Sequence, residues 1–378
     1  MDRYLKSLVI KDLQSKIVLI MGPRQCGKTT LAKALNPDCD YFNYDAEPDR
    51  LILKEQSWDR NKSLIIFDEL HKMTGWKQWL KGIYDTQGIP PQLLVTGSAK
   101  LDVFRKVGDS LAGRYFQYRM HPIDLKEAKQ FIGGDVDALF EQLWHCSGFP
   151  EPFLKNNPTY YRRWQRSHLE IILRQDVLDL TAVRDIFALE TLVELLKDRV
   201  GSTVSYANLA RNIERDANTV KRWLELLENL YVIYRVTPYH KNIARALLKE
   251  PKYYFYDHAQ VSNVGARLEN IVANALLKEL HFIQDTTGKN IDLHFVRTKE
   301  GHEIDFLICI DRVPTHLIEV KTTDDEPARS FHHFQPYFPA VQQIQLVKTL
   351  KREKTFPNGL QIRRVAKWLA ELDLDLSS

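Results

Sequence analysis

The sequence predicts an α/β protein with a nucleotide-binding core on a mostly parallel sheet, a helical middle segment and a second α/β domain at its C-terminal end. Three observations predict this fold class. Residues 22–29 read Gly-Pro-Arg-Gln-Cys-Gly-Lys-Thr, a phosphate-binding loop between a predicted strand and a predicted helix. Two more apolar runs end in polar residues, at 68–69 and at 96–98. Beyond residue 250, an amphipathic helix precedes alternating apolar strands.

The phosphate loop follows an apolar, β-branched run at 17–20, and residues 30–35 are typical of a helix. Such a loop binds anions because free backbone N–H groups and the helix dipole point at the same place. We expect Lys28 to reach the β- and γ-phosphates of a nucleotide and the Thr29 hydroxyl to bind Mg²⁺. The predicted nucleotide-binding residues are Gly22, Pro23, Arg24, Gln25, Cys26, Gly27, Lys28, Thr29 and Thr30.

A second strand is predicted at 63–67, and it runs into Asp68 and Glu69. Parallel strands that are covered on both faces read as continuous apolar runs, and their C-terminal ends carry the chemistry. We expect Asp68 to hold Mg²⁺, directly or through water. We expect Glu69 to orient and polarise the attacking water in nucleotide hydrolysis.

A third strand, at 92–98, ends in small polar residues. Ser98 or Thr96 could hydrogen-bond the γ-phosphate or the lytic water, although an ordinary strand-to-loop turn fits these residues as well. Arg114 follows a glycine further along the chain. It could neutralise transition-state charge, within one chain or from a neighbouring subunit, whereas most arginines in such a position are surface residues.

Composition limits the class of protein. A chain of 378 residues with 44 % hydrophobic and 27 % charged residues is long enough for two or three globular domains. Its net charge of +4 permits nucleic-acid contact without arguing for it. No apolar run could cross a bilayer, and the N-terminus lacks a signal-peptide core. Four cysteines without zinc or redox spacing fit a reducing compartment, so we expect a cytoplasmic protein without membrane partners.

The nucleotide-binding core is expected to cover residues 1–122, because a last strand gives way there to a proline turn. The pattern then becomes helical, beginning with a capping sequence at 124–128 and broken at 147–150. We therefore expect a helical, lid-like segment at 123–200.

Residues 201–250 follow the order helix, turn, helix and strand that is typical of a winged helix. The second helix would present Asn218, Lys221 and Arg222 outward, where they could lie in a DNA major groove. Acidic residues dilute this basic charge, so a module that contacts protein fits the sequence equally well.

Residues 251–378 are predicted to form the C-terminal α/β domain. An amphipathic helix at 267–277 carries Glu269, a strand at 302–308 carries Asp305, and the next strand carries Glu319 and Lys321. Strand alternation places Glu319 and Lys321 on one face. Asp305 and Glu319 could hold Mg²⁺, with Lys321 activating or positioning a water molecule. An exposed, salt-bridged pair of strands is the alternative.

Taken together, the motifs at 22–29, 68–69, 96–98 and 110–114 resemble those of prokaryotic AAA-type P-loop ATPases. These proteins carry a winged helix and a C-terminal restriction-endonuclease-like domain of unknown function, and the likeness covers nearly the whole chain. The resemblance implies ATP as the nucleotide, which agrees with the absence of an Asn-Lys-x-Asp guanine motif. It also implies that Glu269, Asp305, Glu319 and Lys321 correspond to the catalytic core of nucleases of that fold.

Two functions therefore stay open. One is an ATP-hydrolysing AAA-type ATPase coupled to a nuclease-like domain that acts on DNA or RNA. The other is a nucleotide-controlled adaptor that binds a protein or nucleic acid and cuts nothing. Since Arg114 could act across a subunit boundary, a second copy of the chain is an expected partner in either case.

Overall fold

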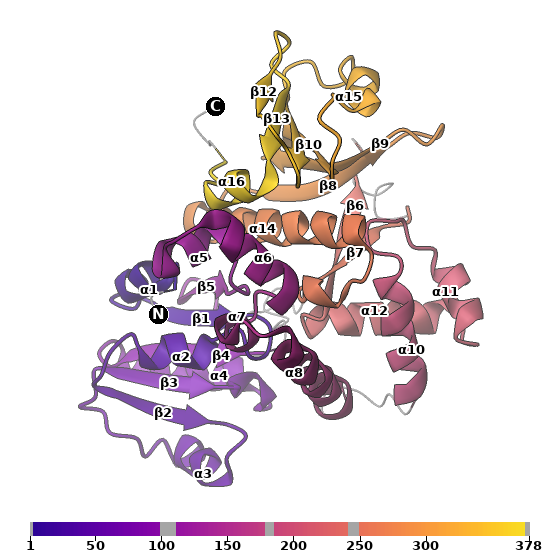
Figure 1. Ribbon diagram of the computed structural model, residues 1–378. Helices are drawn as coiled ribbons and strands as arrows, with labels where there is room; N and C mark the ends of the chain where they lie inside the picture. Colours follow the sequence, from indigo (N-terminus) through magenta and orange to yellow (C-terminus); the bar gives the residue numbers. More distant parts are fainter. Residues whose placement is uncertain (1–2, 99–110, 178–184, 241–248, 375–378) are drawn as a thin grey trace. The chain divides into compact units, whose positions relative to one another are not determined.

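The computed structural model describes residues 3–98, 111–177, 185–240 and 249–374 (Figure 1). These residues divide into two compact units. The first reaches from the N-terminus to Pro122 and includes Asn229–Tyr231, and the second contains the other described residues. No described helix is both long enough and apolar enough to cross a membrane.

The first unit is built on a five-stranded sheet whose strands are all parallel, which agrees with the mostly parallel sheet that the sequence predicts. The strand order is β2-β3-β4-β1-β5. β1 and β3 are buried at every position, because helices cover both faces of the sheet. The strands are β1 (Ile17–Met21), β2 (Cys39–Asn43), β3 (Leu64–Asp68), β4 (Gln92–Gly97) and β5 (Tyr115–Arg119).

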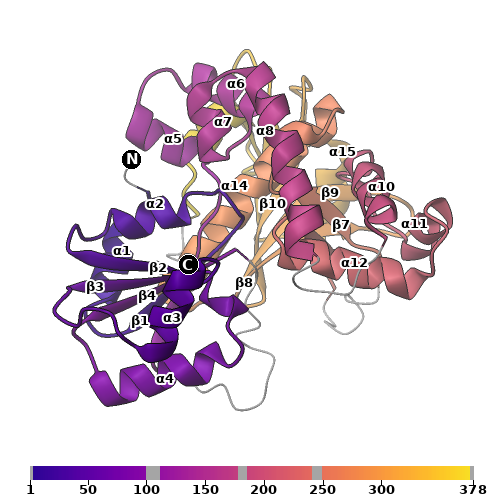
Figure 2. The same ribbon diagram turned by 90° about the horizontal axis from the view of Figure 1, so that it is seen from below.

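Helices α2 and α4 lie on opposite sides of this sheet (Figure 2). The α4 side is closed by aromatic packing, in which the Phe67 ring lies 5.5 Å from that of Trp58 and 5.4 Å from that of Trp79. This packing fixes the β3 strand immediately before its acidic end. The helices of the first unit are α1 (Lys6–Asp12), α2 (Lys28–Lys33), α3 (Glu47–Glu55), the 3₁₀ turn η1 (Leu70–Lys72) and α4 (Trp76–Gln87).

The second unit begins with a run of helices. The predicted cap is confirmed, because the Asp124 side chain accepts a hydrogen bond from the Glu127 N–H at 2.9 Å. The predicted break also falls between two helices. The elements are α5 (Leu125–Ile132), α6 (Val136–Cys146), α7 (Pro150–Lys155), α8 (Pro158–Ile171), the π-helical turn η2 (Ile172–Asp176), α10 (Ile186–Lys197), α11 (Tyr206–Asn212) and α12 (Ala217–Asn229).

A mixed sheet forms the rest of the second unit, with the strand order β12-β13-β11-β10-β9-β8-β6-β7. Its strands are β6 (Ile233–Pro238), β7 (Lys252–Phe255), β8 (Ile291–Arg297), β9 (Glu303–Ile310), β10 (Val313–Lys321), β11 (Gln342–Val347), β12 (Lys354–Thr355) and β13 (Gln361–Arg364). The accompanying helices are η3 (His258–Gln260), α14 (Val264–Thr287), α15 (Arg329–Phe334) and α16 (Val365–Ala370).

β6 joins the middle of the second unit to its C-terminal sheet. It pairs antiparallel with β7 and, through Thr237 and Pro238, parallel with β8. The boundary expected at residue 250 therefore falls between the two strands of one hairpin. The sheet continues without interruption from that hairpin into the C-terminal strands.

α14 is much longer than the helix expected at 267–277. Lys278 and Glu279 interrupt its apolar pattern, but both side chains are buried and ion-paired with the α5 region. The Lys278 ammonium lies 2.6 Å from Glu127 and 2.9 Å from Asp124, and the Glu279 carboxylate pairs with Lys126 at 2.9 Å. Beyond these two residues the apolar pattern resumes at the buried Leu280 and Ile283, and α14 continues to Thr287.

Candidate functional site

The phosphate loop joins β1 to α2 in a conformation that its glycines permit. A Cβ on Gly22 would lie 2.1 Å from the carbonyl oxygen of Met120, so no larger residue fits there. Gly27 adopts a left-handed φ of 98°. The buried Lys28 ammonium donates to the carbonyl oxygens of Gly22 at 2.9 Å and Pro23 at 2.7 Å, which places it across the loop.

The loop is anchored from the side by the N-terminal segment. The Arg3 guanidinium donates to the carbonyl oxygens of Cys26 and His121, each at 2.6 Å. The Cys26 side chain is fully buried, so only its backbone could face a phosphate. Of the other predicted nucleotide-binding residues, Gln25 and Thr30 are exposed and Arg24 is partly exposed.

Three hydroxyl groups converge on the Asp68 carboxylate at the end of β3. Thr29 donates at 2.8 Å and Tyr41 at 2.7 Å, and Thr96 donates to the other carboxylate oxygen. Burial, followed by the hydrogen bond to Asp68, raises the pKa of Tyr41, so this phenol stays protonated. Hydroxyl and carboxylate oxygens are the ligands that Mg²⁺ prefers. Thr29 and Asp68 therefore fit the predicted magnesium site.

Glu69 follows directly, with a left-handed φ of 54°. One of its carboxylate oxygens accepts a hydrogen bond from the Ser98 hydroxyl at 2.9 Å and lies 3.5 Å from Nδ1 of His71. Burial lowers the pKa of His71, which favours its neutral form beside Glu69. The structure thus brings Ser98 to Glu69 and Thr96 to Asp68, at the sheet edge from which the phosphate loop begins.

Arg114 lies elsewhere, and Ser110, which opens the motif expected at 110–114, is outside the described residues. Arg114 immediately precedes β5, and its backbone carbonyl pairs with the N–H of Ile17, the first residue of β1. Because β1 and β5 are parallel, Arg114 lies at the N-terminal ends of the strands, whereas the phosphate loop follows the C-terminal end of β1. Its guanidinium forms a two-pronged ion pair with Asp85, at 2.6 Å and 3.1 Å. A role within one chain is therefore excluded by geometry, and the role across a subunit boundary is the one that stays a prediction.

The predicted C-terminal residues come together in the second unit. β9 and β10 pair Phe306 with Ile318, which sets Asp305 beside Glu319 on one face. The Lys321 ammonium lies 2.7 Å from Glu319, and Asp305 accepts a hydrogen bond from the Val320 N–H at 2.8 Å. Glu269 reaches the same cluster from α14.

A further cation in this cluster, Lys252 from β7, is absent from the expected set. Its ammonium lies 2.6 Å from Glu303, 3.2 Å from Glu269 and 3.8 Å from Asp305. Glu269 also accepts a hydrogen bond from the Tyr254 hydroxyl at 2.6 Å. We call Lys252, Glu269, Glu303, Asp305, Glu319 and Lys321 the charge cluster.

Burial dominates the electrostatics of the charge cluster. It raises the pKa of Asp305 well above its usual value, and the carboxylates of Glu269 and Glu319 raise it further. Burial also raises the pKa of Glu319, although Lys321 opposes that change. Burial disfavours the charged form of Lys252, but the three surrounding carboxylates outweigh it and raise the pKa of that ammonium.

As they stand, these residues do not fit a bound divalent cation. Mg²⁺ and Mn²⁺ require several oxygen ligands around one point. Among the described residues, no three His, Cys, Asp or Glu side chains are grouped in that way. The position among Glu269, Glu303 and Asp305 is taken by an ammonium group. The expected metal ligation by Asp305 and Glu319 is therefore not supported.

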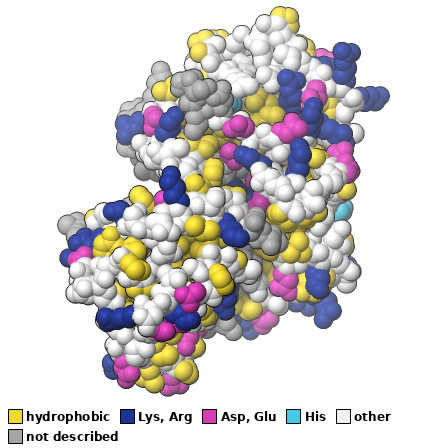
Figure 3. All heavy atoms as spheres, turned by 90° about the vertical axis from the view of Figure 1, so that its left-hand side faces the viewer, with side chains coloured by type: hydrophobic (Ala, Val, Ile, Leu, Met, Phe, Trp, Pro, Cys, Tyr) yellow, Lys and Arg dark blue, Asp and Glu magenta, His cyan; other side chains and the backbone are white. Residues whose placement is uncertain are grey.

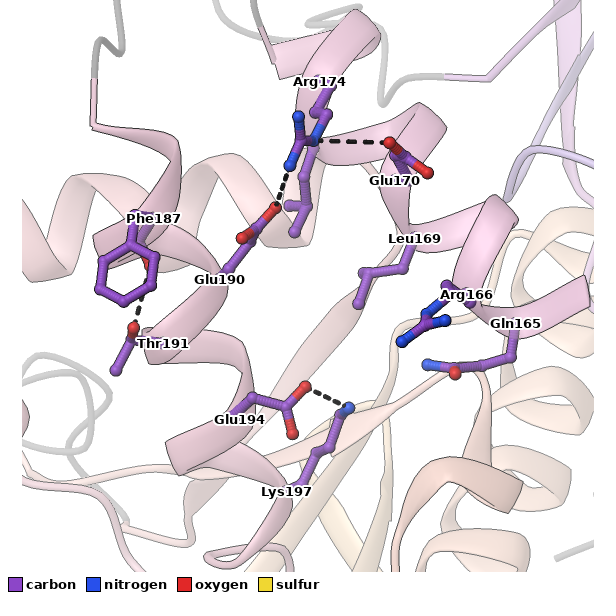
Figure 4. A pocket seen from close by; sticks show the side chains of 11 residues that line it. Gln165, Arg166, Leu169, Glu170, Arg174, Phe187, Glu190, Thr191, Glu194 and Lys197 are labelled. Atoms are coloured by element: carbon purple, nitrogen blue, oxygen red, sulfur yellow. Dashed lines mark hydrogen bonds and ion pairs between the residues drawn. The ribbon is translucent and has the colours of Figure 1, made fainter. Parts of the chain in front are cut away.

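The second unit also contains a cavity of about 670 Å³ (Figure 4). Residues of α8 and η2 line one side of it, and residues of α10 line the other. Phe187, which is 80 % exposed, stands at its rim. Arg174 lies 3.7 Å from both Glu170 and Glu190, and Lys197 pairs with Glu194 at 2.6 Å. Glutamates that line the same cavity neutralise these two cations. The cavity therefore has no strong positive potential that would attract a phosphate, and we assign it no ligand.

The candidate DNA-reading helix, α12, exposes Asn218, Lys221 and Arg222, as expected. The acidic residues Glu214 and Asp216, which come just before α12, are exposed too. The face drawn in Figure 3 likewise mixes Lys and Arg side chains with Asp and Glu side chains. A nucleic-acid footprint usually concentrates basic residues. The geometry is thus compatible with a protein partner as well as with DNA or RNA.

Sequence reasoning missed Tyr41, His71 and Lys252. No local signal marks Tyr41, because its contact with Asp68 depends on the pairing of β2 with β3. His71 could have been suspected from its position just after the acidic pair. Lys252 opens the run Lys-Tyr-Tyr-Phe, and a lysine in an otherwise aromatic strand requires a buried partner.

Comparison with family models matches three parts of the chain. Residues 14–129 match an AAA domain. Residues 137–268 match a domain of unknown function, DUF8612, and residues 264–366 match another, DUF4143. Together with the parallel sheet and the phosphate loop, the first match identifies the N-terminal part as an AAA-type P-loop ATPase domain.

The relatives are uncharacterised proteins. Those of Mycobacterium tuberculosis and Mycobacterium bovis are each 26 % identical over 249 residues, which cover 65 % of this chain and 55 % of the relative. The chain thus spans about half the length of these two proteins. A relative from Haemophilus influenzae is 22 % identical over 413 residues and 98 % of both chains.

Solved structures give only weak likenesses. A RuvB variant from Thermotoga maritima has a TM-score of 0.34 and 16 % identity, covering 61 % of this chain and 88 % of its own. The Bacillus subtilis DNA clamp loader delta protein has a TM-score of 0.28 and 12 % identity, covering 74 % and 98 %. Likenesses this weak do not identify a function, whereas the AAA match and the geometry of the two sites bear on it directly.

Proposed function

We propose that the protein binds ATP with Mg²⁺ and hydrolyses it at the C-terminal edge of the parallel sheet. The observation that carries this proposal is the meeting of Thr29 with Asp68 and of Ser98 with Glu69 beside the phosphate loop. These are separate segments of the chain, and hydrolysis requires all of them at one place. The AAA match over 14–129 supports the same conclusion.

Each residue has a distinct role in this proposal. The loop backbone and the Lys28 ammonium hold the β- and γ-phosphates, while Thr29 and Asp68 hold Mg²⁺, which would neutralise charge on the phosphate oxygens. Glu69 orients and polarises the attacking water. Ser98 positions Glu69 through its 2.9 Å hydrogen bond. Because burial favours neutral His71, this residue does not form a charged ion pair with the Glu69 carboxylate, which stays available to the attacking water.

Outside the ATPase core, we propose that the chain is a nucleotide-controlled adaptor in the cytoplasm. Residues 123–200 would form its helical segment and 201–250 a winged helix, whereas 251–378 would form a nuclease-like scaffold that binds a protein or nucleic acid. The buried ammonium of Lys252 among the carboxylates supports binding without cleavage. Free cysteines at all four positions agree with a reducing compartment.

The ATPase proposal is tested first by Lys28→Ala. Loss of one charge-assisted contact with the phosphates should weaken ATP binding by roughly 10- to 100-fold, since such a contact contributes about 1.5–3 kcal/mol. Binding of a fluorescent ATP analogue measures this change. Lys54→Ala, which removes an exposed lysine from α3, is the matched control and should bind like wild type. Equal affinities for the two variants would contradict the role given to Lys28.

Cleavage of DNA or RNA is the competing function, and one observation favours it, namely the convergence of Glu269, Asp305, Glu319 and Lys321. We expect the full-length protein to leave plasmid, single-stranded DNA and RNA intact in Mg²⁺ or Mn²⁺, with and without ATP. Gel electrophoresis of each substrate measures this outcome.

Metal-dependent cutting that is lost in Asp305→Asn would overturn the adaptor proposal. Asp292→Asn on β8 is the matched control, because that carboxylate is exposed. In this case ATP hydrolysis should be unchanged in both variants, since neither residue belongs to the ATPase core.

A further inference from the structure

Lys252 is a fully buried cation, with an exposed fraction of 0 %. It is the first residue of β7 and pairs with Val236 of β6, while an isolated bridge joins it to Thr203. Its ammonium lies 5.3 Å from the centre of the Phe295 ring. A buried lysine is rare unless carboxylates compensate its charge. The backbone pairing therefore fixes this side chain in the protein interior. A charged ammonium is stable there only if acidic side chains lie beside it.

Those partners surround the ammonium from two further elements. Glu269 comes from α14, and Glu303 and Asp305 come from β9, with distances to Nζ of 3.2 Å, 2.6 Å and 3.8 Å. Carboxylates that converge from separate elements repel one another and need a positive charge between them. The ammonium of Lys252 meets that requirement among Glu269, Glu303 and Asp305, and the Arg297 guanidinium lies 3.5 Å from Glu303 as well.

The surrounding chain leaves Glu269 little room to turn away. A Cβ on Gly201 would lie 2.6 Å from a Glu269 carboxylate oxygen, and the φ of Gly201 is left-handed at 77°. Tyr254 holds the other oxygen of Glu269 by its hydroxyl. Glu269 is therefore held in place toward Lys252 from both sides.

Within the part of the chain that the structure describes, one buried carboxylate oxygen of the charge cluster has no hydrogen-bond partner. Oε2 of Glu319 is buried and has no hydrogen-bond partner among the described residues, whereas Oε1 accepts from Lys321 at 2.7 Å. The Glu319 residue is only 5 % exposed. A buried, unpaired carboxylate oxygen costs free energy, so it is a position at which a cation could bind.

We propose that the charge cluster is a latent divalent-cation site, which Lys252 closes by placing its ammonium among Glu269, Glu303 and Asp305. In the wild-type protein the cluster binds no Mg²⁺ or Mn²⁺. When the ammonium is removed, the same carboxylates, together with the unpaired oxygen of Glu319, bind a divalent ion. The proposal does not depend on ATP hydrolysis in the first unit.

The pKa directions agree with this arrangement. The carboxylates keep Lys252 charged in spite of its burial, and the pKa of Asp305 stays raised in spite of the nearby ammonium. The Lys252 ammonium therefore does not fully offset the effect of burial and of the Glu269 and Glu319 carboxylates on Asp305. A divalent ion would compensate them better, because it carries twice the charge.

The test is Mn²⁺ binding to the full chain, measured by electron paramagnetic resonance as the loss of the free-ion signal. All proteins carry Asp68→Asn, so that the proposed magnesium site of the first unit does not contribute. We expect no bound Mn²⁺ in the protein that carries only Asp68→Asn and therefore keeps Lys252. We expect a gain of bound Mn²⁺ when Lys252→Met is added. Adding Asp305→Asn to Lys252→Met should abolish the gain.

Lys252→Met leaves carboxylates unpaired and could prevent folding, so a charge-balanced variant runs in parallel. Lys252→Met with Glu303→Gln removes one cation and one anion and leaves Glu269, Asp305 and Glu319. It should also gain Mn²⁺ binding, and its circular dichroism spectrum checks the fold. Lys252→Arg, which keeps the charge, is the matched control and should bind no Mn²⁺.

Two results would overturn the proposal. The first is Mn²⁺ binding to the protein that keeps Lys252, if Asp305→Asn abolishes that binding. It would mean that the ammonium does not close the site. Folded Lys252→Met variants that bind no Mn²⁺ would mean that the cluster is an ion-pair network without metal affinity.

Discussion

Glu69→Gln is expected to lower the rate of ATP hydrolysis by about 10²–10⁴-fold, the range that a positioned general base contributes. The amide keeps the shape of the side chain and can still accept the hydrogen bond from Ser98, but it cannot polarise the attacking water. ATP binding should be unchanged, because the phosphate loop and Asp68 are intact. Phosphate release and binding of a fluorescent ATP analogue separate the two effects.

Glu55→Gln, which alters an exposed glutamate on α3, is the control for Glu69→Gln and should hydrolyse ATP like wild type. If Glu69→Gln also hydrolyses ATP at the wild-type rate, another group activates the water. If its ATP affinity falls together with the rate, Glu69 is needed for the structure of the site and its catalytic role is unproven by this variant.

Arg114→Ala is expected to lower ATP hydrolysis by about a thousandfold or more, as removal of a charge-stabilising arginine does in phosphoryl transfer. Since Arg114 lies at the opposite edge of its own sheet, the effect must arise at the nucleotide of a neighbouring chain. The rate per chain should therefore rise with protein concentration. An activity titration over a wide concentration range measures this dependence.

A mixing experiment distinguishes this role from a structural one. Arg114→Ala retains an intact nucleotide site, and Lys28→Ala retains Arg114, so mixing the two inactive proteins should restore part of the activity. Asp85→Ala is the matched control, because it breaks the ion pair and keeps the arginine. If Asp85→Ala loses as much activity as Arg114→Ala and mixing restores nothing, the ion pair is structural and Arg114 is not catalytic.

Much of the candidate ATPase site could be predicted because its parts are local. The phosphate loop is a contiguous motif, and its glycines are required by backbone conformation alone. Asp68, Glu69 and Ser98 each follow an apolar run, and parallel strands bring such ends to one edge. The hydrogen bonds of Thr29 and Thr96 to Asp68 follow from that arrangement.

Contacts across the sheet could not be predicted in this way. Arg114 resembled a catalytic residue because it follows the third strand, yet the parallel pairing of β5 with β1 sends it to the far edge. Lys278 is buried within α14 because Asp124 and Glu127, on another element, pair with its ammonium group. In both cases, the deciding partner is distant in the sequence.

The sequence by itself determined the α/β class, the phosphate loop and the acidic strand end, because each depends on neighbouring residues and on strand periodicity. It also placed Glu269, Asp305, Glu319 and Lys321 on the right elements. Only the tertiary structure decided what those carboxylates face. The pairing of β7 with β6 places the Lys252 ammonium among these carboxylates. The free energy of a buried charge depends on the groups that the fold places within a few ångströms of it.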